Sequence, residues 1–220
     1  MPYLEYCQKA WNKLGWNTLT FYIGKNPPKD TDQNRIIELS QEYLNLGYRE
    51  CTIIQASRLL GAKYIKDGLI MTGDVDMLPM ANYWNPHPDE VTVYGFDLTG
   101  RSQYPICYIA MDAEKWRQVI PETSVNILLD KYPNGKAPDD QFEKWWGVDQ
   151  EIITDRINRI VGKQNVTFID RGFTGGLAYG RVDRYDWQGT LNSGDRKIDA
   201  HMVRPFDKVE AERILNLIQP

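Results

Sequence analysis

Apolar and polar residues follow two different periods along this chain, and the two periods predict alternating helices and strands. From position 2 to position 14, apolar side chains recur every three or four residues, which is typical of one helical face, and Gly15 then ends the helix. The next stretch, 17–23, is rich in aromatic and β-branched residues and predicts a strand. The same reasoning predicts helices at 33–45, 52–60, 113–119, 124–132, 139–146, 150–161 and 208–218, and strands at 68–73, 91–96, 106–111, 166–170 and 197–203.

This alternation predicts an α/β protein built around a sheet. A chain of 220 residues is long enough for one good-sized core, and it contains no repeat, low-complexity tract or linker that would divide it. We therefore expect residues 1–220 to form a single domain, either a whole protein or a piece of a longer chain. An alternating domain is expected to begin with a strand, and none precedes the opening helix.

Two carboxylates stand at the end of the apolar strand predicted at 68–73, in the sequence GLIMTGDVDMLPM. Residues two apart in an extended chain project to the same side, so Asp74 and Asp76 can face one point. Neighbouring carboxylates repel, and Mn²⁺ or Mg²⁺ can supply the counter-charge while bridging them to the phosphates of a substrate. Open α/β sheets bind ligands beyond the carboxyl ends of their strands, where this motif would lie. The plain alternative is a pair of solvated aspartates in a turn.

Composition limits the classes of function. Apolar residues make up 42% and charged residues 25%, and the formal charge of −4 gives no support to nucleic acid or an anionic membrane as a partner. The chain has no run of about 18 apolar residues that could span a membrane, and its start lacks the features of a signal peptide. Three cysteines without a CxxC pair are typical of free thiols in a reducing compartment, so we expect a cytoplasmic protein.

Five short segments together carry a resemblance to a known family. They are CTIIQASRLL (51–60), DVDMLPM (74–80), YIAMDAEKW (108–116), GVDQ (147–150) and DAHMVRPF (199–206). The first three resemble the GT-A fold of nucleotide-sugar-dependent glycosyltransferases, and the fourth is similar to the Asp-Gln motif that those enzymes place near the acceptor. The fifth is similar to the His…Lys-Pro-Trp segment of glycogenin-type retaining members. Each motif alone is weak, but their order and spacing, from about residue 33 onward, are more specific.

The resemblance implies a single-domain, Rossmann-like GT-A fold with a mixed, mainly parallel sheet flanked by helices. It implies a metal-dependent enzyme that moves a sugar from a nucleoside diphosphate sugar, with a UDP-hexose such as UDP-glucose or a UDP-deoxyhexose favoured, to a glycan or glycoprotein acceptor. The glycogenin-like segment favours retention of the anomeric configuration. Small members of this kind occur in bacteria and in large algal viruses, so the cytoplasm of a bacterium or of an infected host cell is the expected setting.

The resemblance also assigns roles to single residues. The metal ligands would be Asp74, Asp76 and His201, and this mixed oxygen and imidazole set suits Mn²⁺ better than Mg²⁺. His201 is one of only two histidines, although a lone histidine is more often a packed or surface residue than a ligand. The nucleotide sugar would be bound by Asp74, Asp76, Arg58 and Gln55. Arg58 suits phosphate oxygens or the aspartate pair, and a surface salt bridge is its plain alternative.

The acceptor side is predicted at Asp149 and Gln150, as acceptor binding or as catalytic assistance on the face opposite the leaving group. Asp149 is also well placed to be a helix N-cap, as Asp112 is for the helix at 113–119, and the two roles are compatible. The tryptophans at 145–146 could stack on a sugar or pack in the core. The glycines at 175–176 could belong to a lid or to a turn.

The chain departs from the family pattern in two places, and two other functions compete with the resemblance. The sequence PIC at 105–107 stands where many members carry Asn-x-Gly against the donor sugar, and the first strand is missing, so neither sugar nor base is assigned. A phosphohydrolase of the haloacid dehalogenase type also places Asp-x-Asp after an apolar strand, but near the N-terminus and followed by Thr or Val where this chain has Leu78. A carbohydrate-binding module built on the seven tryptophans and thirteen tyrosines would not need both aspartates.

Overall fold

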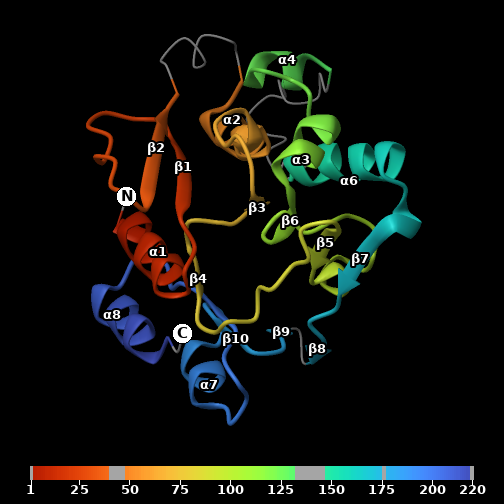
Figure 1. The fold of residues 1–220 in the computed structure, drawn as a ribbon. Helices are drawn as coiled ribbons and strands as arrows, with labels where there is room; N and C mark the ends of the chain where they lie inside the picture. Colours follow the sequence, from red (N-terminus) through yellow and green to blue (C-terminus); the bar gives the residue numbers. More distant parts are fainter. Residues whose placement is uncertain (1, 40–47, 132–146, 175–176, 219–220) are drawn as a thin grey trace.

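The computed structural model describes residues 2–39, 48–131, 147–174 and 177–218. Within these ranges helices and short strands alternate along the chain, which confirms the predicted α/β class (Figure 1). No helix in the described ranges is long and apolar enough to cross a membrane. The helix predicted at 139–146, the tryptophan pair at 145–146 and the glycine pair at 175–176 lie outside the described residues.

Most predicted elements are present, with ends displaced by a few residues. The helices are α1 (Pro2–Lys13), α2 (Glu50–Ser57), α3 (Ala113–Val119), α4 (Val125–Asp130), α6 (Val148–Ile160), α7 (Trp187–Asn192) and α8 (Lys208–Leu217), with 3-10 helices η2 (Arg58–Lys63), η3 (Phe96–Thr99) and η6 (Lys163–Asn165). The strands are β1 (Thr18–Tyr22), β2 (Asn34–Glu38), β3 (Leu69–Met71), β4 (Met77–Pro79), β5 (Val91–Tyr94), β6 (Ile109–Asp112), β7 (Val166–Ile169), β8 (Phe173–Thr174), β9 (Leu177–Ala178), β10 (Arg181–Asp183) and β11 (Asp199–His201). The strands β2, β4 and β10 and the helix α7 were not predicted, and β8 and β9 lie where a glycine-rich loop was expected.

The strands pair into small sheets of mixed direction. One sheet has the order β3-β6-β5-β7, in which β6 is antiparallel to both neighbours and β5 runs parallel to β7. A second has the order β10-β11-β4, with β11 parallel to β10 and antiparallel to β4. The strands β1 and β2 form a parallel pair, and β8 and β9 an antiparallel one. A single, mainly parallel sheet is therefore not what the described strands form.

The helix predicted at 33–45 is wrong over its first half. Residues 34–38 form β2, which lies parallel to β1 in the register Thr18 to Asn34. The adjacent isoleucines at 36 and 37 favour a strand as much as a helix, and the neighbouring strand β1 decides between them. The remainder, 40–45, lies outside the described residues. The first strand of the described residues is β1, which follows α1.

Two apolar cores lie on either side of the Asp-x-Asp segment, which we define as residues 72–76. The first core joins the β3-β6-β5-β7 sheet to α2, α3, α4 and α6. The second joins the β10-β11-β4 sheet to α1, α7 and α8, and Figure 1 shows α1 and α8 side by side near β4. Because β3 belongs to one sheet and β4 to the other, the Asp-x-Asp segment connects the two.

Candidate functional site

The Asp-x-Asp segment follows the predicted strand, although that strand is short and only partly buried. Strand β3 ends at Met71, the backbone N–H of Met77 donates to the carbonyl of Asp74 at 3.1 Å, and β4 then begins. The backbone N–H of Met202 donates to the carbonyl of Asp76 at 2.9 Å, which fixes the segment against the end of β11. The backbone carbonyl of each aspartate therefore accepts one backbone hydrogen bond, which helps to fix the position of both residues.

A cavity of about 850 Å³ opens beside this segment. Its walls come from α1, β1, α2, the Asp-x-Asp segment and the region from β11 to Arg204. It contains all five residues predicted for the donor and the metal, namely Gln55, Arg58, Asp74, Asp76 and His201. Its volume lies within the range of small-molecule and cofactor sites, which is roughly 300–1,000 Å³.

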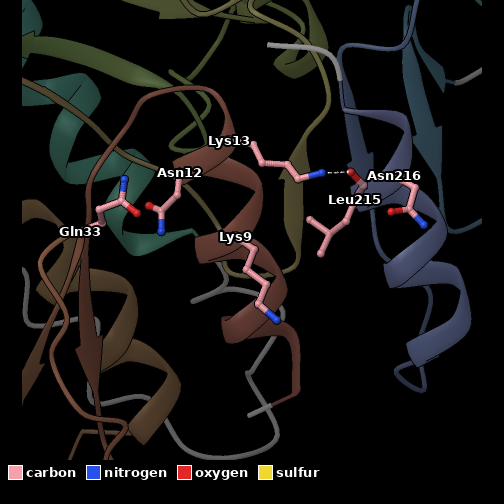
Figure 2. Close-up of a pocket in the computed structure, with 6 residues that line it drawn as sticks. All are labelled: Lys9, Asn12, Lys13, Gln33, Leu215 and Asn216. Atoms are coloured by element: carbon pink, nitrogen blue, oxygen red, sulfur yellow. Dashed lines mark hydrogen bonds between the residues drawn. The ribbon is translucent and has the colours of Figure 1, made fainter.

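A second cavity, of about 510 Å³, lies between α1 and α8 and contains none of the predicted residues (Figure 2). The Nζ of Lys13 donates to the carbonyl of Leu215 at 2.7 Å across it, and Lys9 donates to Glu5 at 2.5 Å. Its cationic groups thus already have partners within the chain. We take the cavity beside the Asp-x-Asp segment as the candidate site.

Asp76 is the buried anionic centre of the site. Its Oδ2 accepts hydrogen bonds from Nη2 of Arg184 at 2.6 Å and from Nη2 of Arg204 at 2.5 Å. Burial alone would raise the pKa of Asp76, but the bonds and charges of the two arginines, together with the nearby His201, lower it below its ordinary value. Asp76 is therefore a carboxylate at neutral pH, and its charge is balanced by side chains that the sequence analysis did not assign to the metal or donor.

Asp74 has a different cationic partner. The Nη1 of Arg58 donates to Oδ1 of Asp74, and the Nε of the same guanidinium lies 3.1 Å from Oδ2 of Asp149. Burial raises the pKa of Asp149, whose side chain is 1% exposed, and the nearby Arg58 only partly offsets this. Arg58 thus bridges two carboxylates: that of Asp74, which lines the cavity, and that of Asp149, which is buried and does not line it.

The two residues predicted on the acceptor side do not line this cavity. Asp149 was predicted as the N-cap of its helix, which is wrong: α6 begins at Val148, and its N-cap is Gly147 with a φ of 96°, a conformation that glycine permits. Asp149 lies in the first turn of α6, and its Oδ1 accepts from the backbone N–H of Gln150 at 2.9 Å. The side-chain Oε1 of Gln150 accepts from the backbone N–H of Ile106 at 3.4 Å.

Asp183 and Arg184, which the sequence analysis missed, do not line the cavity but contact His201 and Asp76, which do. The parallel register of β10 and β11 places Asp183 beside His201, and Arg184 follows in the next position. The Nδ1 of His201 lies 3.9 Å from Oδ2 of Asp183, and its Nε2 lies 3.9 Å from Oδ2 of Asp76. The available signal was the sequence RVD at 181–183, whose polar-apolar-polar alternation after Gly180 is typical of a short strand.

Two of the three predicted metal ligands lie near each other, but the oxygen concerned, Oδ2 of Asp76, already accepts from Arg184 and Arg204. Asp76 and His201 present an oxygen and an imidazole nitrogen to one cavity, 3.9 Å apart. In octahedral coordination at about 2.1 Å, neighbouring donor atoms lie about 3.0 Å apart, so these two atoms would have to approach each other to bind one ion side by side. The carboxylate of Asp74 is instead bonded to Arg58. Within the described ranges no three His, Cys, Asp or Glu side chains are placed to hold a metal ion together.

The cysteines form no disulfide, as predicted. Cys7, Cys51 and Cys107 are all free, and burial raises the pKa of Cys7 and of Cys107 to about 12. These two thiols are therefore protonated at neutral pH and poorly nucleophilic, which argues against a role as catalytic thiolates.

Comparison of the chain with family models, with curated proteins and with solved structures gives no match.

Proposed function

We propose that this chain is a GT-A-type glycosyltransferase that uses a divalent metal ion and a nucleoside diphosphate sugar, with a UDP-sugar favoured. One observation carries the proposal: a single cavity contains every residue predicted for the donor and the metal, although they come from α2, η2, the Asp-x-Asp segment and β11. The acceptor would be a glycan or a glycoprotein. Retention of the anomeric configuration, favoured by the glycogenin-like segment, belongs to the same proposal.

The chemistry needs stabilisation of a departing diphosphate. Transfer of a glycosyl group develops positive charge on the anomeric carbon and negative charge on the leaving group. A bound Mn²⁺ or Mg²⁺ would stabilise and orient that leaving group. Asp76 and His201 would hold the ion. Arg58 and Arg204 line the same cavity, and their planar guanidinium groups suit phosphate oxygens.

Another part of the cavity lining suits a nucleoside. It is formed by α1 and by every residue from Thr18 to Ile23, and Trp11 and Trp16 add aromatic surface. Within the described residues β1 pairs only with β2, so one edge of β1 is left without a partner strand. Backbone N–H and C=O groups along such an edge can bind the polar edge of a base, while the aromatic rings contact its face.

Asp149 would act through Arg58 in this proposal. It is buried and does not line the cavity, so it holds the guanidinium in place and does not touch the acceptor. Gln150 would position the backbone of 105–107, the segment that replaces the donor-contacting Asn-x-Gly of the family. Both residues would therefore position groups that bind the donor without contacting the donor themselves.

Calorimetry with UDP-glucose, with and without Mn²⁺, tests the proposal. We expect binding that needs Mn²⁺ in the wild type and is lost in Asp76→Asn, because the variant removes the anionic ligand at nearly constant volume. Asp67→Asn is the matched control, since Asp67 is exposed and precedes the other end of β3. UDP-glucose binding that is equally strong without Mn²⁺ and in Asp76→Asn would overturn the proposal.

Two further assays separate the competing functions. Release of phosphate from p-nitrophenyl phosphate in the wild type, lost in Asp74→Asn, would identify a phosphohydrolase. Binding of an oligosaccharide that is indifferent to both EDTA and Asp76→Asn would identify a carbohydrate-binding module. A glycosyltransferase is expected to show neither result.

A further inference from the structure

The mixed sheet β10-β11-β4 aligns three segments of the site across neighbouring strands. Asp183 pairs with His201 in the parallel register of β10 and β11, and His201 pairs with Met77 in the antiparallel register of β11 and β4. Adjacent strands lie about 4.8 Å apart. Asp183, His201 and the end of the Asp-x-Asp segment are therefore held side by side by backbone pairing, independently of any ligand.

The imidazole of His201 lies between two carboxylates with different surroundings. Oδ2 of Asp76, next to Nε2, already accepts from two arginines. Oδ2 of Asp183, next to Nδ1, faces the ring, while Oδ1 of Asp183 accepts from the backbone N–H of Tyr185 at 3.0 Å. Asp183 is therefore the carboxylate with an oxygen available to the imidazole.

Asp183 is also the more firmly held partner. Its backbone N–H donates to Oγ1 of Thr190 at 2.9 Å, and its side chain is 9% exposed, whereas that of His201 is 25% exposed. The separation of 3.9 Å exceeds a hydrogen bond by about 1 Å, which a small rotation of the partly exposed ring can close. The ring can adjust to Asp183 more readily than Asp183 can adjust to the ring.

We propose that Asp183 is a positioning residue for His201. A neutral imidazole has one N–H and one nitrogen lone pair, and a carboxylate that accepts from Nδ1–H leaves the lone pair on Nε2. That lone pair then points toward Asp76 and the cavity, ready to bind a cation. Carboxylates behind metal-binding histidines fix the tautomer and ring orientation in the same way. The identity of the cation rests on the proposed function, but the tautomer is a property of the chain alone.

Nitrogen NMR of the metal-free protein tests the tautomer directly. The chain has two histidines, so labelling with ¹⁵N-histidine gives two ring systems, and the exposed His87 serves as an internal reference. In the neutral imidazole, we expect the His201 proton on Nδ1 in the wild type. In Asp183→Ala we expect it to shift to Nε2, and in the control Asp186→Asn, an exposed residue of the same turn, to stay on Nδ1.

A wild-type proton on Nε2, or an unchanged His201 pattern in Asp183→Ala, would overturn the proposal. Asp183→Asn is a second variant that keeps the side-chain volume: its single oxygen can accept from the Tyr185 N–H, which leaves its NH2 group facing Nδ1 and should also move the His201 proton to Nε2. If neither variant folds, the wild-type spectrum alone decides. An altered His87 pattern would identify a variant whose fold has changed.

Titration with Mn²⁺ separates this proposal from the proposed function. We expect Mn²⁺ to broaden the His201 signals but not those of His87, and Asp183→Ala to weaken Mn²⁺ binding by about 10–100-fold. If Mn²⁺ binds at His201 but the tautomer is the same in the wild type and in Asp183→Ala, the role of Asp183 is overturned and the metal in the proposed function is not. The expected tautomer without any Mn²⁺ binding would support that role and overturn the metal in the proposed function.

Discussion

Arg58 connects the two parts of the predicted site that the resemblance assigned to donor and acceptor. Its Nη1 donates to Asp74 in the cavity wall, and its Nε lies 3.1 Å from the buried Asp149. The sequence analysis named all three residues but could not show that one guanidinium holds both carboxylates. At the scale of the residue, this arginine therefore has a structural role and a proposed binding role that experiment can separate.

Removal of Arg58 is expected to destabilise the fold. Arg58→Ala leaves Asp149 buried without its counter-charge, and breaking a buried ion pair by removing one partner costs about 3–5 kcal/mol. Urea unfolding at neutral pH measures this loss. The double variant Arg58→Ala/Asp149→Ala is expected to recover much of the stability without recovering UDP-glucose binding. Recovery of both would show that Arg58 has no contact with the donor.

At the scale of the element, one N-cap, Asp112, was predicted correctly and another, Asp149, was not, while the long-range strand pairings were not predicted at all. Asp112 was predicted as an N-cap, and its Oδ1 accepts from the backbone N–H groups of Glu114 at 2.8 Å and Lys115 at 3.0 Å. Such a cap depends on residues within one turn. The strand β2 was predicted as a helix because its partner strand, not its own pattern, fixes its conformation. Strand β10 was missed although its three residues alternate between polar and apolar, because so short a pattern is a weak signal.

Asp199 ties three elements together and predicts an acid-dependent stability. It is fully buried in β11 and accepts from Arg171, which follows β7, and from Arg181 of β10. Burial alone would raise the pKa of Asp199, but the two arginines lower it well below its ordinary value. A lowered folded-state pKa gives stability that is present above the unfolded value, about 3.9, and is lost as pH falls toward the folded value.

Asp199→Asn is therefore expected to destabilise the protein by about 3 kcal/mol or more at neutral pH, because it leaves the two arginines without their carboxylate. The difference in the free energy of unfolding between the variant and the wild type should become smaller as pH falls below about 4. Urea unfolding at about pH 7, 4 and 3 measures this difference, and the exposed Asp195→Asn is the control. A difference that is constant over this range would contradict the lowered pKa.

At the scale of the whole molecule, the site lies where the two cores meet, and this explains which of its residues were predictable. Asp74 and Asp76 were found because their signal is local to one strand end. Arg184 was not, since it reaches Asp76 across 108 positions of sequence through the pairing of β10 with β11 and of β11 with β4. No local pattern specifies such a pairing; it follows from how the second sheet assembles. The resemblance located His201 without showing what lies beside it.

A ligand in this cavity is expected to protect backbone amides from both cores at once. With UDP-glucose and Mn²⁺ at about 100 times the dissociation constant, ligand binding raises the free energy of any local opening that requires ligand release by about 2.7 kcal/mol. Amides at 17–23, 71–76 and 201–204 should then exchange about 100-fold more slowly, while those of α3 and α4 stay unchanged.

Hydrogen exchange followed by mass spectrometry measures this pattern, with Asp76→Asn as the control that should show no protection. All three ranges are expected to respond because β1, the Asp-x-Asp segment and the region from His201 to Arg204 all line the same cavity. Protection of one of these ranges alone would mean that the ligand does not bridge them. Protection at 9–13 and 215–216 would instead place the donor in the groove between α1 and α8 (Figure 2), and the assignment of the site would then be wrong.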